Sequence, residues 1–475
     1  MVATSIGTIV LLYCLATGQE PLMLETNDLQ QSVPSEHVRD LTVWTPYRMD
    51  YVEAYLHWRQ KSQFVGASSG ILRIDAAWSE SNIPLEDAMD HLAILEGGEW
   101  QWSILSIFDG HWGCETASLL QQWLSKYILR ELANAHQRCF PQSKILRYKE
   151  MPTEIVDQAV KDAFTSLDRI IIDGGAEAAV GDRFLNDAMC ELSPSYSGSC
   201  ALVSLYQHEA KVLKVACTGD SRAILGRQNE AGIWEAIVLS VDQTGHNEDE
   251  VARLRSEHPN EPDMIKDGRL LGLAVTRAFG DGIWKWPREV QEAAQQRFFG
   301  RRPRVGLQSP PYLTAEPIIT TTKICPEKGD FLIMATDGLW DRLTNEQAVD
   351  LVGTWLQNYS PSVEAQISSA PLAESGDLEQ ERAHTQEEAR TRGKPEPQKA
   401  YPAQVARADA KHFTVKDSNA ATHLVRNALG GSNEDMLRGL LTVPPPFSRN
   451  LRQAKVFILD EHAIHPRNYI LGTDC

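Results

Sequence analysis

Cysteines are scarce in this sequence, and none of them has the spacing of a zinc-binding or redox pair. Eight cysteines are spread over 475 residues without a Cys-x-x-Cys motif. This absence argues against a structural zinc site and against a disulfide framework. We therefore expect a reducing, intracellular compartment.

Basic residues are also few. Lys and Arg number 46 against 64 Asp and Glu, which gives a formal net charge of −18 at pH 7. Because nucleic-acid phosphates are bound by a basic protein face, nucleic acid is excluded as an expected partner. The excess of carboxylates is compatible with binding of divalent cations, and it also favours solubility.

Long apolar runs are missing as well. The stretch 6–18 is apolar but too short to span a membrane comfortably, so we expect no stable membrane span. No Lys or Arg precedes Arg39, whereas a secretory signal or a mitochondrial presequence would carry basic residues there. The role of 6–18 stays unassigned.

What is present is the composition of an ordinary globular protein, with 42% hydrophobic and 23% charged residues. The length suits two or three domains, or one large domain with insertions. We expect an N-terminal extension at 1–65 with an amphipathic piece at 52–58, one mixed domain at 66–460, and a C-terminal tail at 461–475.

Two segments have the composition of insertions. Residues 287–311 are polar and basic, and residues 363–408 contain few large apolar side chains and are expected to be disordered. Two interpretations stay open. The insertions shape a substrate groove or dock a partner, or they are surface loops that cost the fold little.

Hydrophobic periodicity predicts the regular elements. The expected strands are 102–108, two strands within 200–220, 235–240 and 330–338. The expected helices are 114–135, 152–172 and 419–431. Strands and helices come in runs rather than in strict alternation, and the pair in 200–220 is typical of a hairpin. This favours an antiparallel sheet core with helices packed outside it.

Carboxylates gather where the apolar strands end. In SIFDGHWG, residues 106–113, an apolar run stops at Asp109, Gly110 and His111. The stretch 330–341 repeats the pattern with Asp337 and a further carboxylate at Asp341. An acidic pair, Glu86 and Asp87, precedes the first of these strands.

Each of these features alone is typical of a turn, a solvated surface pair or a structural histidine. Together the carboxylates would repel one another unless a cation intervenes. Oxygen ligands favour Mg²⁺ or Mn²⁺ over zinc, and two such ions about 4 Å apart activate water and polarise a phosphoryl group. His111 is then placed to protonate a leaving group.

Four motifs in this order resemble the metal-dependent Ser/Thr protein phosphatases of type 2C: FDGHWG, CTGDSRAIL, LLGLAVTRAFGD and ATDGLWD. Three more resemble the pyruvate dehydrogenase phosphatase branch of that family: SNIPLED, PPYLTAEP and NAATHLVRNALGG. The resemblance extends over about residues 70–450, which is most of the chain.

The resemblance implies an α+β fold, a four-layer α-β-β-α sandwich of two antiparallel sheets flanked by helices. It implies hydrolysis of phosphoserine or phosphothreonine on a protein, by direct attack of a water activated by two Mg²⁺ or Mn²⁺ ions. The branch suggests the pyruvate dehydrogenase complex as the partner and the mitochondrial matrix as the location. Without that suggestion the chain would be placed in the cytoplasm.

The resemblance also implies residue roles. Asp109 and His111 would be catalytic, His111 as general acid. The metal ligands would be Glu86, Asp87, Asp109, the carbonyl of Gly110, Asp337 and, for an additional weaker ion, Asp341. The segment 219–222 and Arg277 match family signatures that we assign mainly to architecture, with Arg222 pairing locally.

Three departures from the family pattern stand out. Asn82 replaces an arginine that grips phosphate in many members, and Ser195 replaces an aspartate for a third metal. Gln453 and Ala454 stand where carboxylates open the last strand, and Asp460 lies past its far end. Loss of a direct ligand predicts weak metal binding, unless the true C-terminal sequence differs from this one.

Two hypotheses therefore stand side by side. One is an active metal-dependent phosphatase; the other is a pseudophosphatase that uses the same fold for binding or regulation. An unrelated two-metal phosphoesterase is a third alternative, which the ordered motifs disfavour.

Overall fold

The computed structural model describes residues 48–65, 71–79, 84–96, 99–142, 151–304, 306–358, 407–443 and 454–460. All described residues belong to one compact unit, Pro46–Cys475. Several features singled out in the sequence lie outside the described residues: 6–18, Asn82, Gln453, most of 363–408, and 461–475.

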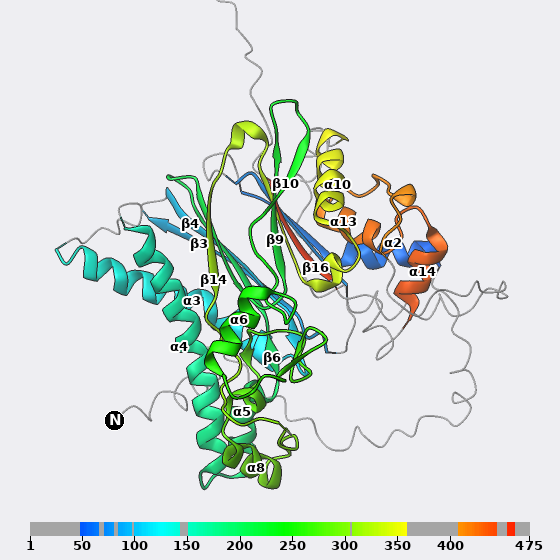
Figure 1. Ribbon diagram of the computed structural model, residues 1–475. Helices are drawn as coiled ribbons and strands as arrows, with labels where there is room; N and C mark the ends of the chain where they lie inside the picture. The colour runs from blue at the N-terminus through cyan, green and yellow to red at the C-terminus, as the bar shows by residue number, and fades with distance from the viewer. Residues whose placement is uncertain are drawn as a thin grey trace, which may run out of the picture. The chain divides into compact units, whose positions relative to one another are not determined.

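Two antiparallel sheets form the centre of this unit (Figure 1). The larger sheet has the order β1 (Gln60–Phe64), β2 (Arg73–Ser79), β16 (Ala454–Asp460), β15 (Phe331–Ala335), β9 (Arg222–Gln228), β10 (Trp234–Val238). The smaller has the order β14 (Ile318–Lys323), β8 (Val212–Thr218), β7 (Ala201–Gln207), β4 (Glu99–Phe108), β3 (Ala88–Glu96).

The sheets pack face to face because their strands are apolar on both sides. Along β15, Leu332 and Met334 face the core between the sheets, whereas Phe331 and Ile333 pack on the other side against helices. Strand β4 also buries both of its faces, and Leu105 faces the core between the two sheets. Two-faced burial of this kind requires a layer of helices outside each sheet.

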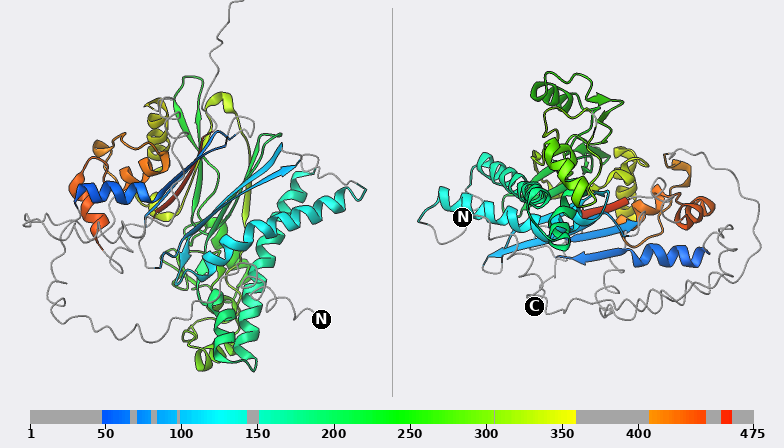
Figure 2. Two further views of the ribbon diagram at one scale, coloured as in Figure 1. Left: turned by 180° about the vertical axis from the view of Figure 1, so that it is seen from behind. Right: turned by 90° about the horizontal axis from the view of Figure 1, so that it is seen from below.

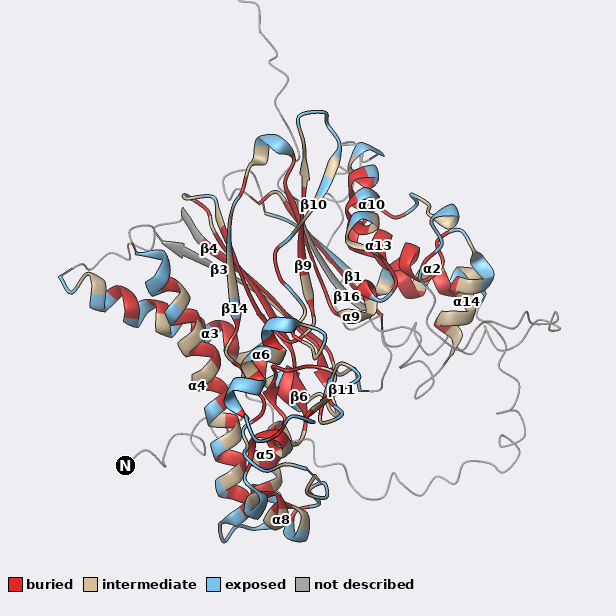
Figure 3. Ribbon diagram, viewed as in Figure 1, coloured by how far each residue is buried: buried red, intermediate tan, exposed pale blue. Residues whose placement is uncertain are grey.

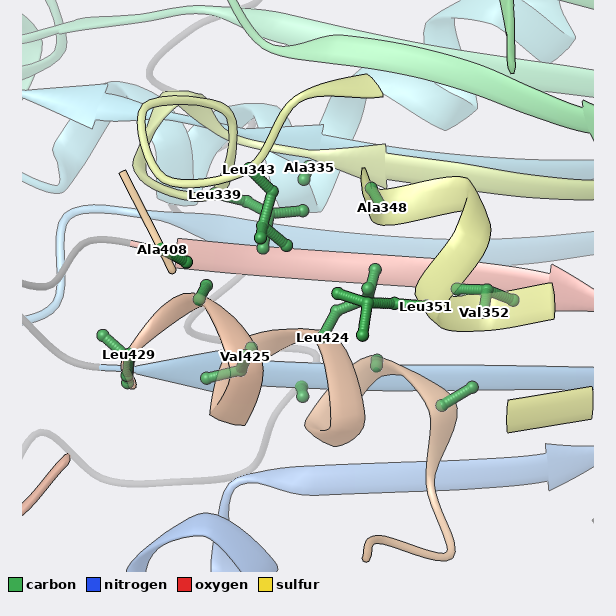
Figure 4. Packing of buried hydrophobic residues seen from close by; sticks show 14 of the residues in the cluster. Ala335, Leu339, Leu343, Ala348, Leu351, Val352, Ala408, Leu424, Val425 and Leu429 are labelled. Carbon is green, nitrogen blue, oxygen red and sulfur yellow. The ribbon is translucent and has the colours of Figure 1, made fainter. Parts of the chain in front are cut away.

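Helices supply both outer layers (Figure 2). On the five-stranded sheet lie α3 (Glu115–Cys139) and α4 (Thr153–Val180). On the six-stranded sheet lie α2 (Met49–Trp58), α10 (Asn345–Asn358), α13 (Ala420–Ala428) and α14 (Glu434–Thr442). Figure 4 shows Leu351, Leu424 and Val425 of this layer packed together. The expected α-β-β-α sandwich is thereby confirmed.

Most expected elements are present with shifted ends. The hairpin in 200–220 is β7 and β8, and the helix predicted at 152–172 is α4, which extends to Val180. Helix α13 ends just before Gly430 and Gly431, whose φ angles of 137° and 60° suit glycine.

The N-terminal boundary of the domain differs from the one expected at residue 65. Helix α2 belongs to the buried layer on the six-stranded sheet, and β1 is the edge strand of that sheet. Strand β1 reads QKSQF and is largely exposed, so its sequence carries little sign of burial. Residues 49–64 therefore belong to the sandwich.

Short elements connect the layers near one end of the sheets. These are α5 (Leu185–Tyr196), α6 (Glu248–Glu257), α7 (Gly282–Lys285), α8 (Arg288–Arg297), α9 (Asp337–Trp340), the pair β11 (Ile265–Lys266) and β12 (Arg269–Leu270), and a sheet of β13 (Phe279–Gly280), β6 (Gly198–Ser199) and β5 (Gly110–His111). Helices α5 and α8 each bury one side and expose the other (Figure 3). Across the described residues, no helix has the length and apolar character needed to cross a bilayer.

Candidate metal and catalytic site

Acidic residues from neighbouring strands meet at one end of the five-stranded sheet. Ala88 on β3 pairs with Phe108 on β4, so Asp87 stands opposite Asp109 just beyond the paired strands. A Cβ built on Gly110 would lie 2.1 Å from the carbonyl oxygen of Glu86, so only glycine allows this approach. The register thus brings four of the predicted ligand positions side by side.

Two further carboxylates join them, one from the other sheet and one from a connection between the sheets. Asp337 follows β15 and opens α9, and Asp220 lies in the connection that crosses from β8 to β9. Burial raises the pKa of Asp109 well above its usual range, and the charges of Asp337, Asp87 and Asp220 raise it further. The pKa of Asp337 is raised in the same way, by burial and by Asp220 and others. Mutual repulsion therefore disfavours ionisation of all these carboxylates together, unless a cation binds among them.

His111 lies beside this cluster and is held by a buried carboxylate. His111 on β5 pairs with Gly198 on β6, Gly198 pairs with Gly280 on β13, and Asp281 follows directly. His111 Nε2 lies 2.7 Å from Asp281 Oδ2. Burial alone would lower the pKa of His111, but Asp281, Asp220 and nearby carboxylates raise it overall. These negative charges favour the protonated form of the imidazole.

Comparisons with known proteins show the family of this chain. The family model of protein phosphatase 2C matches residues 77–374. The chain belongs to the protein phosphatase 2C family. A protein phosphatase 2C homolog of Schizosaccharomyces pombe is 37% identical over 407 residues, covering 83% of this chain and 82% of the relative.

Two other relatives of this phosphatase are named for pyruvate dehydrogenase. The mitochondrial pyruvate dehydrogenase (acetyl-transferring) phosphatase 1 of Saccharomyces cerevisiae is 36% identical, covering 84% of this chain and 70% of the relative. The Bos taurus protein of that name is 30% identical, covering 84% and 78%. The crystal structure of serine-threonine phosphatase 2C from Toxoplasma gondii aligns with a TM-score of 0.45 and 16% identity, covering 84% of this chain and 99% of that one.

Membership makes this chain a protein serine/threonine phosphatase by family, and enzymes of the family depend on Mg²⁺ or Mn²⁺. The donors gathered here are oxygen atoms, which suit such hard cations. Within the part of the chain that the structure describes, however, no three His, Cys, Asp or Glu side chains form a ready-made metal cage.

Asp341 lies at the edge of the candidate site. It ends α9, one turn after Asp337, and its side chain is exposed. The side chain reaches solvent but is partly desolvated, and this partial desolvation raises the pKa of Asp341; the charge of Arg342 lowers the pKa and that of Asp242 raises it. A pocket of about 620 Å³ lies between this residue, Asp337 and Asp220.

Sequence reasoning missed two members of the site, Asp220 and Asp281. Each follows a glycine within one of the family motifs, CTGDSRAIL and LLGLAVTRAFGD. Asp109 and Asp337 are also next to a glycine, so an aspartate beside a glycine was the signal that could have identified Asp220 and Asp281. Asp220 was assigned to architecture with its motif, yet it acts on the pKa of Asp109 and of His111. Asp281 is fully buried, with a φ of 56°.

The arginines of the same motifs do have architectural contacts. Arg277 donates to Glu250 at 2.7 Å and to the carbonyl of Glu316 at 2.6 Å, which ties the segment before Asp281 to α6. Arg222 pairs with Asp242 just beyond the β9–β10 hairpin, at 2.5 Å.

Ser195 and β16 carry the departures from the family pattern. Ser195 Oγ donates to the carbonyl of Ile171 at 2.7 Å, which joins α5 to α4. Val456 pairs with Ala335, the last residue of β15, so Ala454 begins β16 at the same end of the sheet as Asp337. Asp460 pairs with Phe331 at the opposite end. As expected, Asp460 is too far along the strand to replace a ligand next to Asp337.

Proposed function

We propose that this chain is an active metal-dependent protein phosphatase whose metals are held by the cluster around Asp109. The observation that carries the proposal is the pairing of that cluster with the His111–Asp281 hydrogen bond of 2.7 Å. One group of carboxylates would hold cations, and a proton carrier lies next to it.

The proposed ligands are the carboxylates of Asp109 and Asp337, the carbonyl of Gly110, and Glu86 and Asp87 directly or through water. Asp341 would serve an additional ion. When bound, the two ions supply an activated water and neutralise charge on the phosphoryl group. The carboxylate cluster supplies the negative charge that attracts them.

His111 is proposed to give a proton to the serine or threonine oxygen as the phosphate leaves. Asp281 holds the ring through Nε2, so Nδ1 is the nitrogen that we propose gives the proton. The raised pKa of His111 maintains the protonated form that a general acid requires.

As substrate we propose phosphorylated pyruvate dehydrogenase, with the mitochondrial matrix as location. Support comes from the relatives in Saccharomyces cerevisiae and Bos taurus, which are named for that substrate and organelle.

The pseudophosphatase alternative is favoured by one observation. Ala454 begins β16 at the end of the sheet where Asp337 lies, so the first position of this strand carries no carboxylate. Without that ligand the ions are held by fewer side chains, and losing even an outer-shell partner costs about 10- to 100-fold in metal affinity or activity.

The test is phosphate release by the purified full chain from a phosphoserine peptide and from phosphorylated pyruvate dehydrogenase, with Mg²⁺, Mn²⁺ or EDTA. Metal-dependent release that disappears in Asp109→Asn supports the enzyme. Release from the peptide but not from pyruvate dehydrogenase rejects only the proposed substrate. Release that occurs only in the double variant Gln453→Asp/Ala454→Asp supports the pseudophosphatase.

A further inference from the structure

Two tryptophans form a platform beside the His111–Asp281 pair. Trp112 follows His111 with a φ of 62°, and its ring meets the imidazole edge-on at 5.7 Å. Trp284 in α7, three residues after Asp281, stacks on Trp112 at 4.8 Å. Trp284 is fully buried, so it fixes the position of Trp112 next to the proposed proton donor.

A basic segment runs over this platform. Residues 301–304, Arg-Arg-Pro-Arg, follow α8 in the segment that the sequence marked as inserted. The guanidinium carbon of Arg301 lies 3.8 Å from the centre of the Trp112 ring, and that of Arg304 lies 4.3 Å from the centre of the Trp284 ring. Such cation–π contacts orient a guanidinium without using its hydrogen-bond donors.

The two arginines differ in what else they bind. Arg304 donates to the carbonyl of Leu271, which fastens the segment to the fold. Arg301 is exposed, and no hydrogen bond or ion pair joins it to any residue that the structure describes. The charge of Asp281 reaches both arginines. Arg301 thus offers free donors close to the proton carrier.

A guanidinium next to the acidic cluster would offset the repulsion between the carboxylates and an incoming phosphoryl group. A phosphoryl group carries negative charge into a cluster of carboxylates, and Asn82, where the family resemblance places a phosphate-gripping arginine, carries no charge. The planar fork of a guanidinium matches two phosphate oxygens at once.

We propose that Arg301, oriented by Trp112, binds the phosphoryl group of the substrate from the inserted segment, in place of the arginine missing at Asn82. Arg304 is a positioning residue that holds the segment on Trp284. This inference rests on the proposed function, since it names how that site takes its substrate.

The test compares Arg301→Gln with Arg302→Gln, its exposed neighbour, which makes no hydrogen bond or ion pair with the described residues. Two readouts are used on the full chain with Mg²⁺. The first is kcat and KM for the phosphoserine peptide. The second is calorimetric binding of inorganic phosphate, which needs no turnover.

For Arg301→Gln we expect KM and the phosphate dissociation constant to rise about 10-fold, because charge-assisted hydrogen bonds to phosphate are stronger than neutral ones. We expect kcat of Arg301→Gln to change less than about 2-fold. The KM and phosphate dissociation constant of Arg301→Lys should lie between those of the parent chain and of Arg301→Gln. Arg302→Gln should match the parent chain in both values. Equal phosphate affinity in Arg301→Gln and Arg302→Gln would overturn the inference, as would a lowered melting temperature with unchanged phosphate binding.

The two proposals fail separately. Phosphate binding that depends on Arg301 in a chain that releases no phosphate would reject the catalytic proposal and keep the arginine's role. Phosphate release that is indifferent to Arg301 would reject only the inference.

Discussion

His111 and Asp281 are separated by 170 positions in sequence, yet Nε2 of one lies 2.7 Å from Oδ2 of the other. The contact exists because three two-residue strands, β5, β6 and β13, pair side by side. Asp281 is fully buried, and its charge raises the pKa of His111.

Replacing Asp281 with Asn should lower kcat by at least about 10-fold, since positioned general acids contribute about 10²–10⁴-fold. The amide keeps the shape of the side chain but loses the charge that favours the protonated imidazole. Steady-state kinetics on the phosphoserine peptide measure this, with KM expected to change little. An unchanged kcat would contradict a role for the pair in proton transfer.

Gly198→Ala offers a steric test of the same contact. A Cβ at Gly198 would lie 2.3 Å from His111 Nε2 and 2.4 Å from Asp281 Oδ2, so the two groups must move apart. We expect a loss of kcat at least as large as that of Asp281→Asn. Gly439→Ala in α14 is the control, because nothing lies within 4 Å of its added Cβ, and it should leave activity intact.

Asp337→Asn should have opposite effects with and without metal. In EDTA the variant should melt at a higher temperature, because one of the mutually repelling charges around Asp109 is removed. With Mg²⁺ the gain in melting temperature on adding metal should shrink, since that gain follows metal affinity. Thermal melts at several Mg²⁺ concentrations measure both effects. A variant less stable than the parent in EDTA would show that other interactions of Asp337 outweigh the repulsion.

The pH dependence of stability should include a contribution from His208, which follows β7 at the end of the five-stranded sheet opposite Asp109. Burial lowers the pKa of His208 from 6.5 to about 4, and its Nε2 lies 2.9 Å from Ser103 Oγ. The unfolded chain therefore binds this proton more readily, so the free energy of unfolding falls as pH drops from 6.5 toward 4.

Urea unfolding at pH 7 and pH 5 checks the sign. His208→Gln should lose less stability between the two pH values than the parent chain does. Replacing the exposed His57 with Gln should leave the difference in stability between pH 7 and pH 5 equal to that of the parent chain. An equal loss of stability in His208→Gln and the parent would remove His208 from the explanation.

The strand ends and their carboxylates were predictable because long apolar strands such as β4 and β15 are recognisable in the sequence. Asp220 and Asp281 were not, since their places depend on which strands pair. Strand β13 has only two residues, Phe279 and Gly280, too few for any periodicity. Strand β1 was missed because it is polar and exposed.

The acidic cluster takes its members from both halves of the sandwich. Asp87 and Asp109 extend from the five-stranded sheet, Asp337 extends from the six-stranded sheet, and Asp220 sits in the chain that joins the two. A cation held among them would act as a cross-link between the layers. Its affinity would then report on the spacing of the sheets, so trimming an inner-core side chain such as Leu225 should weaken ion binding without touching a ligand.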